Sequence, residues 1–221
     1  MSGPIPTLYR TELLSRRRLA ENAFEITLAR PAGFGFRAGQ WITLQFGDTG
    51  RDYSLVTAPR EPNLALCVRH VEGGTYSSEL AVLEPGAPLS FTGPHGYLVF
   101  RKSPLKPVFV ATGTGIAPFV SMARDGVNGF ILLHGVSTGA ELFYREELQA
   151  AAEAYIPCLS GGRESAVSGA YSGLVTTFLE TGLPEGAYAF YLSGRGEMIR
   201  DVTRLVDDRF PGSRIHSETF Y

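Results

Sequence analysis

The pattern of apolar residues changes near residue 103, and this change limits the folds that the chain can adopt. Before that point, short apolar or alternating runs follow one another between Gly, Pro and Asn, and a single stretch, 77–83, looks helical. Ser77 is a suitable N-cap for that helix. Many evenly spaced strands with one short helix predict a small antiparallel β-barrel. The expected strands cover residues 7–14, 23–29, 41–46, 53–57, 64–71 and 88–92.

A polar, proline-bearing linker at 101–107 opens the second half, in which strands alternate with helices. That alternation predicts a doubly wound parallel sheet. We therefore expect two domains, 1–102 and 103–221. The expected strands are 108–111, 130–134, 155–159, 188–192 and 214–217, and the expected helices are 117–124, 141–153, 174–180 and 197–209.

Composition and charge exclude several classes of function. A hydrophobic content of 44% over 221 residues suffices for packed cores, and a net charge of −2 argues against a nucleic-acid binder. The one dense basic run, Arg16-Arg17-Arg18, is expected at a solvated strand end, with a docking patch for an acidic partner protein as the alternative. No apolar run reaches membrane-spanning length and no signal-peptide pattern is visible. We therefore expect a cytoplasmic protein without membrane contact.

The two cysteines, Cys67 and Cys158, lie far apart and outside any metal-ligand spacing. Each stands in an apolar run, which predicts a buried strand thiol. A plant-type iron–sulfur cluster needs four thiolates. The sequence therefore predicts no metal site, and any such cluster would belong to another protein.

A glycine turn follows the first expected strand of the second half. Thr112, Gly113 and Gly115 lead from that strand into a helix whose first turn holds Pro118. Glycine allows close approach of a ligand, and free N–H groups at a helix start attract anions. Proline suits the first helical turn, where an N–H has no partner. The third glycine of the dinucleotide fingerprint is absent, so this stretch alone fits a ligand-free turn equally well.

A second short stretch, Arg51-Asp52-Tyr53-Ser54, stands at one of the expected barrel strands. Arginine can bind a phosphate through two parallel hydrogen bonds, tyrosine offers a flat ring, and serine offers a hydroxyl. Taken alone, Tyr53 fits an ordinary strand aromatic and Ser54 an exposed strand hydroxyl.

Read together, the segments resemble the ferredoxin–NADP reductase superfamily, in particular the bacterial-type ferredoxin/flavodoxin–NADP reductases. The resemblance covers nearly the whole chain and rests on the order of its motifs. The matching segments are Arg51-Asp52-Tyr53-Ser54, Gly73-Gly74-Thr75-Tyr76-Ser77 with Leu80, Gly93-Pro94-His95-Gly96, Gly113-Thr114-Gly115-Ile116-Ala117-Pro118, Leu192-Ser193-Gly194 with Glu197-Met198, and Glu218-Thr219-Phe220-Tyr221.

The resemblance implies a flavin-binding barrel followed by a nicotinamide-dinucleotide domain. FAD, with FMN as the less favoured flavin, would be held by Arg51, Tyr53, Ser54, Gly74, Thr75 and Ser77. The nicotinamide coenzyme would be held by Thr112, Gly113, Gly115, Pro118, Arg163, Gly194 and Met198.

The resemblance also implies four residues close to the reacting atoms. Ser54 would hydrogen-bond flavin N5, and Glu218 would help to move a proton there. Tyr221 would cover the flavin face where nicotinamide stacks. Ser193 stands where the family usually has a cysteine beside the nicotinamide, so that contact is expected to persist with altered strength.

The choice of coenzyme rests on few residues. NADP-specific relatives bind the 2′-phosphate through several arginines, and Arg163 matches one of them. Ser137 and Leu174 stand where other arginines are expected. Because charge-assisted bonds to phosphate are strong, losing them weakens discrimination. We expect a weak preference for NADPH over NADH.

These expectations combine into an FAD-dependent ferredoxin (or flavodoxin)–NAD(P)H reductase that acts as a monomer. Hydride would pass between nicotinamide C4 and flavin N5, and single electrons would pass to ferredoxin or flavodoxin. One alternative is a reductase component of an oxygenase or a free-flavin reductase. A second, of another class, is an electron-transfer or redox-sensing subunit without its own NAD(P)H turnover.

Overall fold

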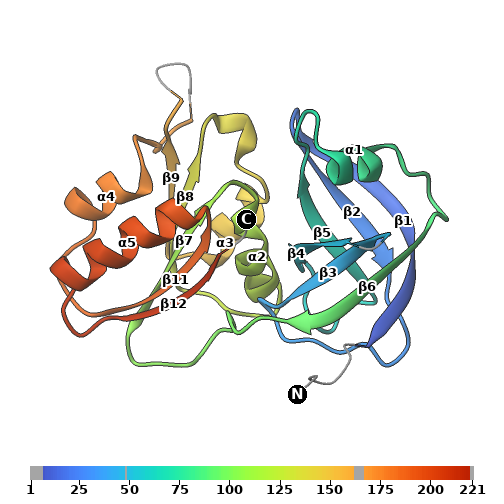
Figure 1. The fold of residues 1–221 in the computed structure, drawn as a ribbon. Helices are drawn as coiled ribbons and strands as arrows, with labels where there is room; N and C mark the ends of the chain where they lie inside the picture. The colour runs from blue at the N-terminus through green and yellow to red at the C-terminus, as the bar shows by residue number, and fades with distance from the viewer. Residues whose placement is uncertain (1–6, 48, 162–166, 220–221) are drawn as a thin grey trace.

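The structure, a computed structural model, describes residues 7–47, 49–161 and 167–219. Two six-stranded sheets account for most of the fold (Figure 1). One sheet is built from the first half of the chain and the other from the second half, as the change of pattern near residue 103 predicts.

The first sheet is antiparallel throughout, with the order β4-β3-β6-β1-β2-β5. Leu55, just beyond β4, forms a bridge with Leu66 of β5, so the two edges of the sheet meet. The predicted barrel-like fold is confirmed. Its strands are β1 (Leu8–Ala20), β2 (Ala23–Ala29), β3 (Trp41–Phe46), β4 (Thr49–Ser54), β5 (Asn63–Arg69) and β6 (Pro88–His95).

Alternation along the strands fills the barrel interior. Phe24, Ile26 and Leu28 occupy every second position of β2, and all three are buried in the barrel core with Leu44 and Phe91. Because successive side chains of a strand point to opposite faces, this spacing places an apolar face inward.

Three expectations for the barrel need correction. β1 continues to Ala20, so Arg16-Arg17-Arg18 lie inside a long exposed strand instead of at its end. The strand expected at 53–57 is β4, which ends at Ser54. The helix is α1 (Thr75–Val82), with Gly74 as its N-cap. Ser77 does not cap it, because the Ser77 hydroxyl bonds the backbone of Val71.

The second sheet is parallel, with the order β10-β9-β8-β7-β11-β12. The predicted doubly wound sheet is confirmed, and the short strand β10 was not expected. The strand order reverses between β7 and β11, which is where such sheets bind ligands. The strands are β7 (Lys106–Thr112), β8 (Ile131–Val136), β9 (Ala154–Leu159), β10 (Tyr171–Ser172), β11 (Tyr188–Gly194) and β12 (Arg214–Thr219).

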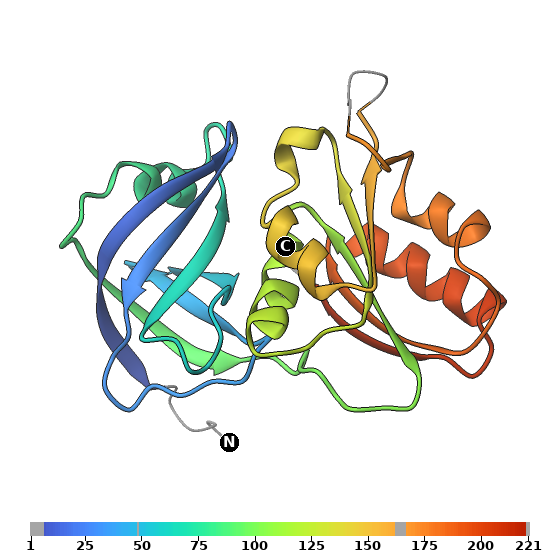
Figure 2. The same ribbon diagram turned by 180° about the vertical axis from the view of Figure 1, so that it is seen from behind.

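Helices cover both faces of this sheet, α2 (Ala117–Arg124) and α3 (Arg145–Ala151) toward the barrel and α4 (Val175–Thr181) and α5 (Gly196–Arg209) away from it (Figures 1 and 2). Neighbouring residues of β7 divide between the two faces. Phe109 packs in the core that includes α2, and Val108 and Val110 pack in the core under α4 and α5.

The helix expected at 141–153 is interrupted. A short 3₁₀ helix, η2 (Gly139–Glu141), precedes α3, and Tyr144 between them has φ 57° in the left-handed region. Left-handed backbone breaks a right-handed helix and costs about 1–2 kcal/mol for a non-glycine residue. A tertiary contact compensates, because the Tyr144 hydroxyl donates to Glu25 Oε2 of the barrel at 2.8 Å.

Barrel and parallel sheet share one hydrophobic cluster. It contains Val56 and Leu98 from the first half and Phe119 and Met122 from α2. Ser121 Oγ adds a buried hydrogen bond of 2.6 Å to the carbonyl oxygen of Thr57. These contacts fix the two sheets relative to each other and define the space between them.

Candidate functional site

A cleft of about 880 Å³ lies between barrel and parallel sheet, lined from both. Its barrel wall comes from β4 and β5, and its other wall comes from the turns after the strands of the parallel sheet. The turns after β7 and β11 stand on either side of the point where the strand order reverses.

The barrel wall brings together Arg51, Tyr53 and Ser54, which all line the cleft. Tyr53 is largely buried, and this burial raises the pKa of its hydroxyl to about 12 against the opposing effect of Arg51. Tyr53 therefore stays neutral over the physiological range. Ser54 is buried at the end of β4, contrary to the exposed hydroxyl that an ordinary strand end would give.

Arg51 lies between the cleft and helix α1. Its guanidinium carbon stands 4.3 Å from the ring centre of Tyr76, in the first turn of α1. The ring of Tyr76 also packs on Phe46 at 4.7 Å. Arg51 Nη1 donates a hydrogen bond of 2.9 Å to the carbonyl oxygen of Gly50, which leaves the other guanidinium N–H groups for a ligand. Arg51 is thus oriented by α1 while it still faces the cleft.

The segment predicted to bind the flavin diphosphate lies beside the cleft. Val71 lines the cleft, whereas Gly74, Thr75 and Ser77 do not. Ser77 Oγ accepts a hydrogen bond of 3.1 Å from the N–H of Val71 and is buried. The structure thus gives the Ser77 hydroxyl a role in holding the loop before α1.

The two glycine turns of the parallel sheet interlock. A Cβ on Gly115 would lie 2.5 Å from the carbonyl oxygen of Ser193, and one on Gly194 would collide with Thr112 Oγ1. Gly113 differs from both, since it has φ +54° and no atom within 4 Å of a Cβ position. Gly115 and Gly194 therefore serve close packing, and Gly113 leaves its side of the turn open to a ligand.

Further predicted residues surround this pair of turns. Thr112, Gly113, Gly115, Gly194 and Met198 line the cleft. Pro118 lies in the first turn of α2, as predicted from its missing N–H, but it is buried and does not line the cleft.

Ser193 immediately precedes Gly194, which lines the cleft, but Ser193 itself is fully buried and does not line it. Its Oγ has no hydrogen-bond partner among the described residues. Leaving a buried hydroxyl without a partner is costly.

Glu218 lies on β12 and faces the barrel. Its Oε1 accepts a hydrogen bond of 2.7 Å from Nε1 of Trp41, on β3, while its Oε2 is buried without a partner in the described part of the chain. Burial raises the pKa of the carboxyl to about 7, which outweighs the hydrogen bonds from Trp41 and the Tyr97 backbone. A carboxyl with this pKa can give or take a proton near neutral pH.

Two predicted residues, Arg163 and Tyr221, lie outside the described residues. Ser137 and Leu174, where relatives were expected to have arginines, both line the cleft. Leu174 exposes 58% of its surface, which is high for an apolar side chain.

Sequence reasoning missed several residues of the cleft. Cys67, Arg69 and Val71 line it from every second position of β5 and its extension, and this period of two was the signal that could have found them. Glu141 and Arg195 also line the cleft. Glu141 was not foreseeable, because its position depends on a hydrogen bond of 3.0 Å from Asn22 of the barrel.

Both cysteines are buried, free and placed in strands, as predicted. Burial raises the pKa of each thiol to about 12, so neither is a reactive thiolate near neutral pH. Within the described ranges, no group of three or more His, Cys, Asp or Glu side chains could hold a metal ion. Of the helices in those same ranges, none is long and apolar enough to cross a membrane.

The donors in the cleft suit an anionic, aromatic ligand. Arg51 offers a cation, Tyr53 a ring, and the Gly113 turn open backbone at the start of a helix. Ser193 and Glu218 do not line the cleft themselves; their unpartnered atoms, Ser193 Oγ and Glu218 Oε2, are buried next to the cleft-lining residues Gly194 and Thr219. A flavin together with a nicotinamide dinucleotide presents matching phosphates and rings.

Two protein families match the sequence, one over each sheet. The family described as oxidoreductase FAD-binding domain matches residues 10–100, and the family described as oxidoreductase NAD-binding domain matches residues 109–204.

The curated relatives are of two kinds, one named as a ferredoxin–NADP reductase and one as the electron transfer component of a dioxygenase. Ferredoxin–NADP reductase B of Sorangium cellulosum is 38% identical over 65% of this chain and 64% of its own length. The toluate 1,2-dioxygenase electron transfer component of Pseudomonas putida is 29% identical over 90% of this chain and 63% of its own length. The matched region thus spans less than two thirds of either relative.

Solved structures share the fold over almost the whole chain. A ferredoxin NADP⁺ reductase from Neisseria gonorrhoeae with bound FAD and NADP superposes with a TM-score of 0.83, at 24% identity, over 97% of this chain and 99% of its own. An Amycolatopsis cytochrome P450 reductase superposes equally well, at 25% identity, over 98% of this chain and 71% of its own.

Proposed function

This chain belongs to the ferredoxin–NADP reductase superfamily, and we propose that it is an FAD-dependent ferredoxin (or flavodoxin)–NAD(P)H reductase. The observation that carries the proposal is the single cleft that Arg51, Tyr53 and Ser54 share with the interlocked glycine turns. A flavin site and a dinucleotide site that open into the same space permit direct transfer between their ligands.

The proposed roles follow from the positions of the side chains. Arg51 would bind the flavin diphosphate, Tyr53 would lie flat against the flavin ring, and Ser54 would donate a hydrogen bond to flavin N5. Bound FAD would supply the redox chemistry, accepting hydride from the nicotinamide and releasing single electrons. Glu218, whose carboxyl has a pKa of about 7, would hold or release the proton that accompanies the electrons.

The dinucleotide would occupy the wall formed by the parallel sheet. Backbone N–H groups beyond Gly113 would bind its diphosphate, and the buried hydroxyl of Ser193 would contact the nicotinamide. We propose NADPH as the preferred coenzyme by a small margin, on the basis of Arg163 in the sequence. Arg163 would bind the 2′-phosphate, and Tyr221 would cover the flavin face on which the nicotinamide stacks, as the family resemblance implies.

The chain is also proposed to consist of two domains and to pass electrons to a partner protein. The flavin domain would be residues 1–102 and the nicotinamide domain 103–221, a division supported by the segment between β6 and β7. The chain would act as a cytoplasmic monomer and pass single electrons to ferredoxin or flavodoxin.

A second candidate function is that of the reductase component of an oxygenase. Its support is the similarity to the toluate 1,2-dioxygenase electron transfer component of Pseudomonas putida, which matches 90% of this chain. The two functions differ in the protein that receives the electrons.

The test begins with the visible spectrum of the purified full chain and the identification of the released flavin. Anaerobic titration with NADPH and with NADH then measures whether the flavin bleaches, and ferredoxin, flavodoxin and an oxygenase are offered as acceptors. We expect tightly bound FAD, bleaching by both coenzymes with NADPH slightly favoured, and turnover with ferredoxin or flavodoxin. Absence of flavin would overturn the proposal.

Variants connect the activity to the cleft. Ser54→Ala removes a single hydrogen bond and is expected to slow flavin reduction by about tenfold while the dissociation constant of the coenzyme changes little. Ser90→Ala is the matched control, since Ser90 lies on β6 and does not line the cleft. Flavin that stays oxidised with both coenzymes would instead favour a redox-sensing subunit, and flavin that dissociates readily would favour a free-flavin reductase.

A further inference from the structure

We propose that Arg195 binds the diphosphate group of the nicotinamide coenzyme and acts equally on NADPH and NADH. The inference rests on the proposed function, because it assumes that the dinucleotide occupies the wall formed by the parallel sheet. The proposal adds the positively charged side chain of Arg195, which directly follows Gly194 in the second glycine turn.

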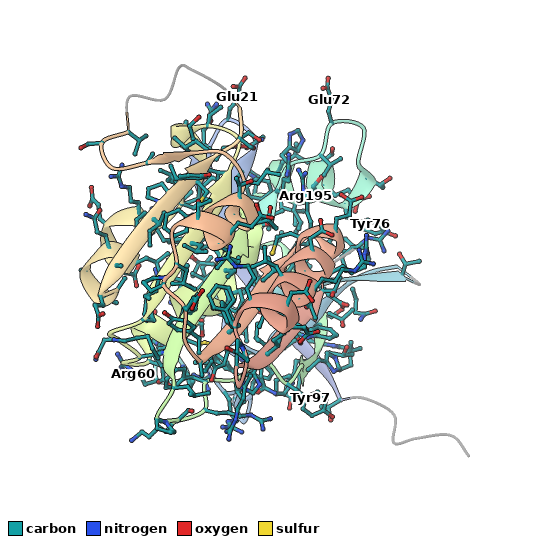
Figure 3. All side chains as sticks on the ribbon, turned by 90° about the vertical axis from the view of Figure 1, so that its left-hand side faces the viewer. Glu21, Arg60, Glu72, Tyr76, Tyr97 and Arg195 are labelled. Atoms are coloured by element: carbon teal, nitrogen blue, oxygen red, sulfur yellow. The ribbon has the colours of Figure 1, made fainter. Side chains whose placement is uncertain are left out.

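Arg195 is fixed beside the first glycine turn. It is the N-cap of α5, it is exposed, and it lines the cleft (Figure 3). Its backbone N–H donates a hydrogen bond of 3.1 Å to Thr112 Oγ1, the residue immediately before Gly113. Since Gly194 also packs on Thr112, the backbone of Arg195 is held next to the open side of the Gly113 turn.

The charges around Arg195 leave its guanidinium free for an anion. Among the described residues it forms no ion pair and no side-chain hydrogen bond. Glu197 and Asp201, in the first and second turns of α5, line the same cleft with negative charge. These carboxylates oppose the attraction of the α5 N-terminus for an anion. Arg195 offsets that repulsion on the side nearest the Gly113 turn.

The order of the strands in the parallel sheet places the proposed diphosphate site and the expected 2′-phosphate site at different turns. Arg195 follows β11, which pairs directly with β7 and its Gly113 turn. Ser137, Ser160 and Leu174 follow β8, β9 and β10, which are two to four strands from β11. With strands roughly 4.8 Å apart, the turns after β9 and β10 lie about 14 and 19 Å from β11, which is farther than one arginine side chain extends. Arg195 therefore reaches a group shared by both coenzymes.

The experiment measures binding of NAD⁺ and NADP⁺ to the oxidised, flavin-loaded protein by isothermal titration calorimetry. We expect Arg195→Ala to raise both dissociation constants by a similar factor of about ten, and Arg195→Lys to recover part of the loss. The salt dependence of binding should become shallower in Arg195→Ala. Arg200→Ala is the matched control, because Arg200 is exposed on the same helix and does not line the cleft.

Each other result contradicts the proposal in a recognisable way. Weaker binding of NADP⁺ alone would assign Arg195 to the 2′-phosphate, and loss of flavin would assign it to the flavin site. Unchanged dissociation constants, or an equal effect of Arg200→Ala, would remove any specific role. If the unaltered protein bound neither coenzyme, the proposed function itself would fail first.

Discussion

Glu218 illustrates how a single side chain acquires its properties from residues distant in sequence. β12 places Glu218 opposite Ser193 of β11, and Nε1 of Trp41 in the barrel donates a hydrogen bond to the Glu218 carboxyl. Gly96 makes the approach possible, because a side chain there would collide with both Glu218 and Trp41. The carboxyl thus lies between the two sheets, where burial keeps its pKa near 7.

The hydrogen bond between Glu218 and Trp41 allows ionisation to be observed directly. Trp41 is the single tryptophan of the chain, so its fluorescence reports on this site. We expect the emission of the flavin-loaded protein to titrate with a midpoint of about pH 7 and the titration to disappear in Glu218→Gln. His95, whose ring centre is 4.6 Å from that of Trp41, and Asp52 also face this group. His95→Gln and Asp52→Asn are therefore controls that should retain a titration.

The same ionisation affects stability. The folded state raises the pKa of the Glu218 carboxyl, so it binds the proton more tightly than the unfolded chain does. This contribution is fully present below the ordinary carboxyl pKa and is lost as pH rises through about 7. Between pH 5 and 8, the melting temperature of Glu218→Gln should therefore fall less than that of the unaltered protein. A steeper fall in the variant would contradict this assignment.

Gly115 leads to a further prediction, which concerns space and not backbone conformation. A Cβ there would meet backbone atoms of Ser193 and Gly194, whereas one on Gly35 would meet nothing within 4 Å, and neither glycine has a positive φ. Gly115→Ala should lower the free energy of unfolding by about 1–3 kcal/mol through overpacking. Gly35→Ala should be neutral or stabilising by up to about 1 kcal/mol. Urea denaturation measures both, and equal effects would refute the packing role.

Among the secondary-structure elements, α1 shows how a short helix with few buried residues can still matter to the cleft. Only Ser77 and Leu80 of α1 are buried. Its contacts toward β4 are made by Tyr76, whose hydroxyl contacts Thr49 and whose ring lies under Arg51. α1 thereby controls the orientation of the arginine that is proposed to bind the flavin diphosphate.

Replacing Tyr76 tests this link between α1 and β4. Tyr76→Leu removes the aromatic face and should weaken FAD binding roughly two- to fivefold, since a cation–π contact at an exposed site is worth about 0.5–1 kcal/mol. Tyr76→Phe keeps the ring, loses only the hydroxyl contact with Thr49, and should bind FAD within about twofold of the unaltered protein. Recovery of flavin fluorescence on dilution gives the dissociation constants. Equal weakening in both variants would assign the effect to the hydroxyl.

For the molecule as a whole, the contact between the two sheets resembles a shared core. Buried apolar residues from the barrel and from α2 belong to one cluster, and Asn22 and Glu25 of the barrel hydrogen-bond Glu141 and Tyr144. Tyr144 keeps a left-handed backbone in this arrangement. Such a contact couples the stability of the two sheets.

Coupled sheets should unfold together. Trp41 fluorescence follows the barrel, and far-UV circular dichroism largely follows the helices of the second half, so the two denaturation curves should coincide. Tyr144→Phe should lower the stability measured at Trp41 by about 1.5–3 kcal/mol, because a bond to a carboxylate is lost. Tyr188→Phe, which loses an exposed hydroxyl bond to Pro184, should change it by less than about 0.5 kcal/mol. Separate transitions would show that the sheets fold independently.

Short-range sequence patterns were sufficient to predict much of the fold. Period-two alternation in residues such as Phe24, Ile26 and Leu28 predicted strands, and glycine with proline at 113–118 predicted a strand–turn–helix unit. Both signals act between neighbouring residues. For the same reason, α2, α5 and the parallel sheet were predicted, whereas the break at Tyr144 was not, because a contact with Glu25 compensates its backbone.

The features of the candidate site fall into the same two groups, those that the sequence predicted and those that it did not. Arg51, Tyr53, Ser54 and the glycine turns were recognisable because their residue types and order carry the chemistry of phosphate and ring binding. The raised pKa of Glu218 and the cleft position of Arg195 were not recognisable.

The sequence thus specified the two kinds of sheet and the residue types suited to a flavin and a dinucleotide, since short-range spacing encodes both. Only the packing of one sheet against the other decided which side chains share the cleft, which are buried and which ionise near neutrality. Burial and hydrogen bonding at Glu218 depend on Trp41, 177 positions away in the chain. No local sequence pattern encodes this contact, because it is set by the sum of the contacts that hold the two sheets together.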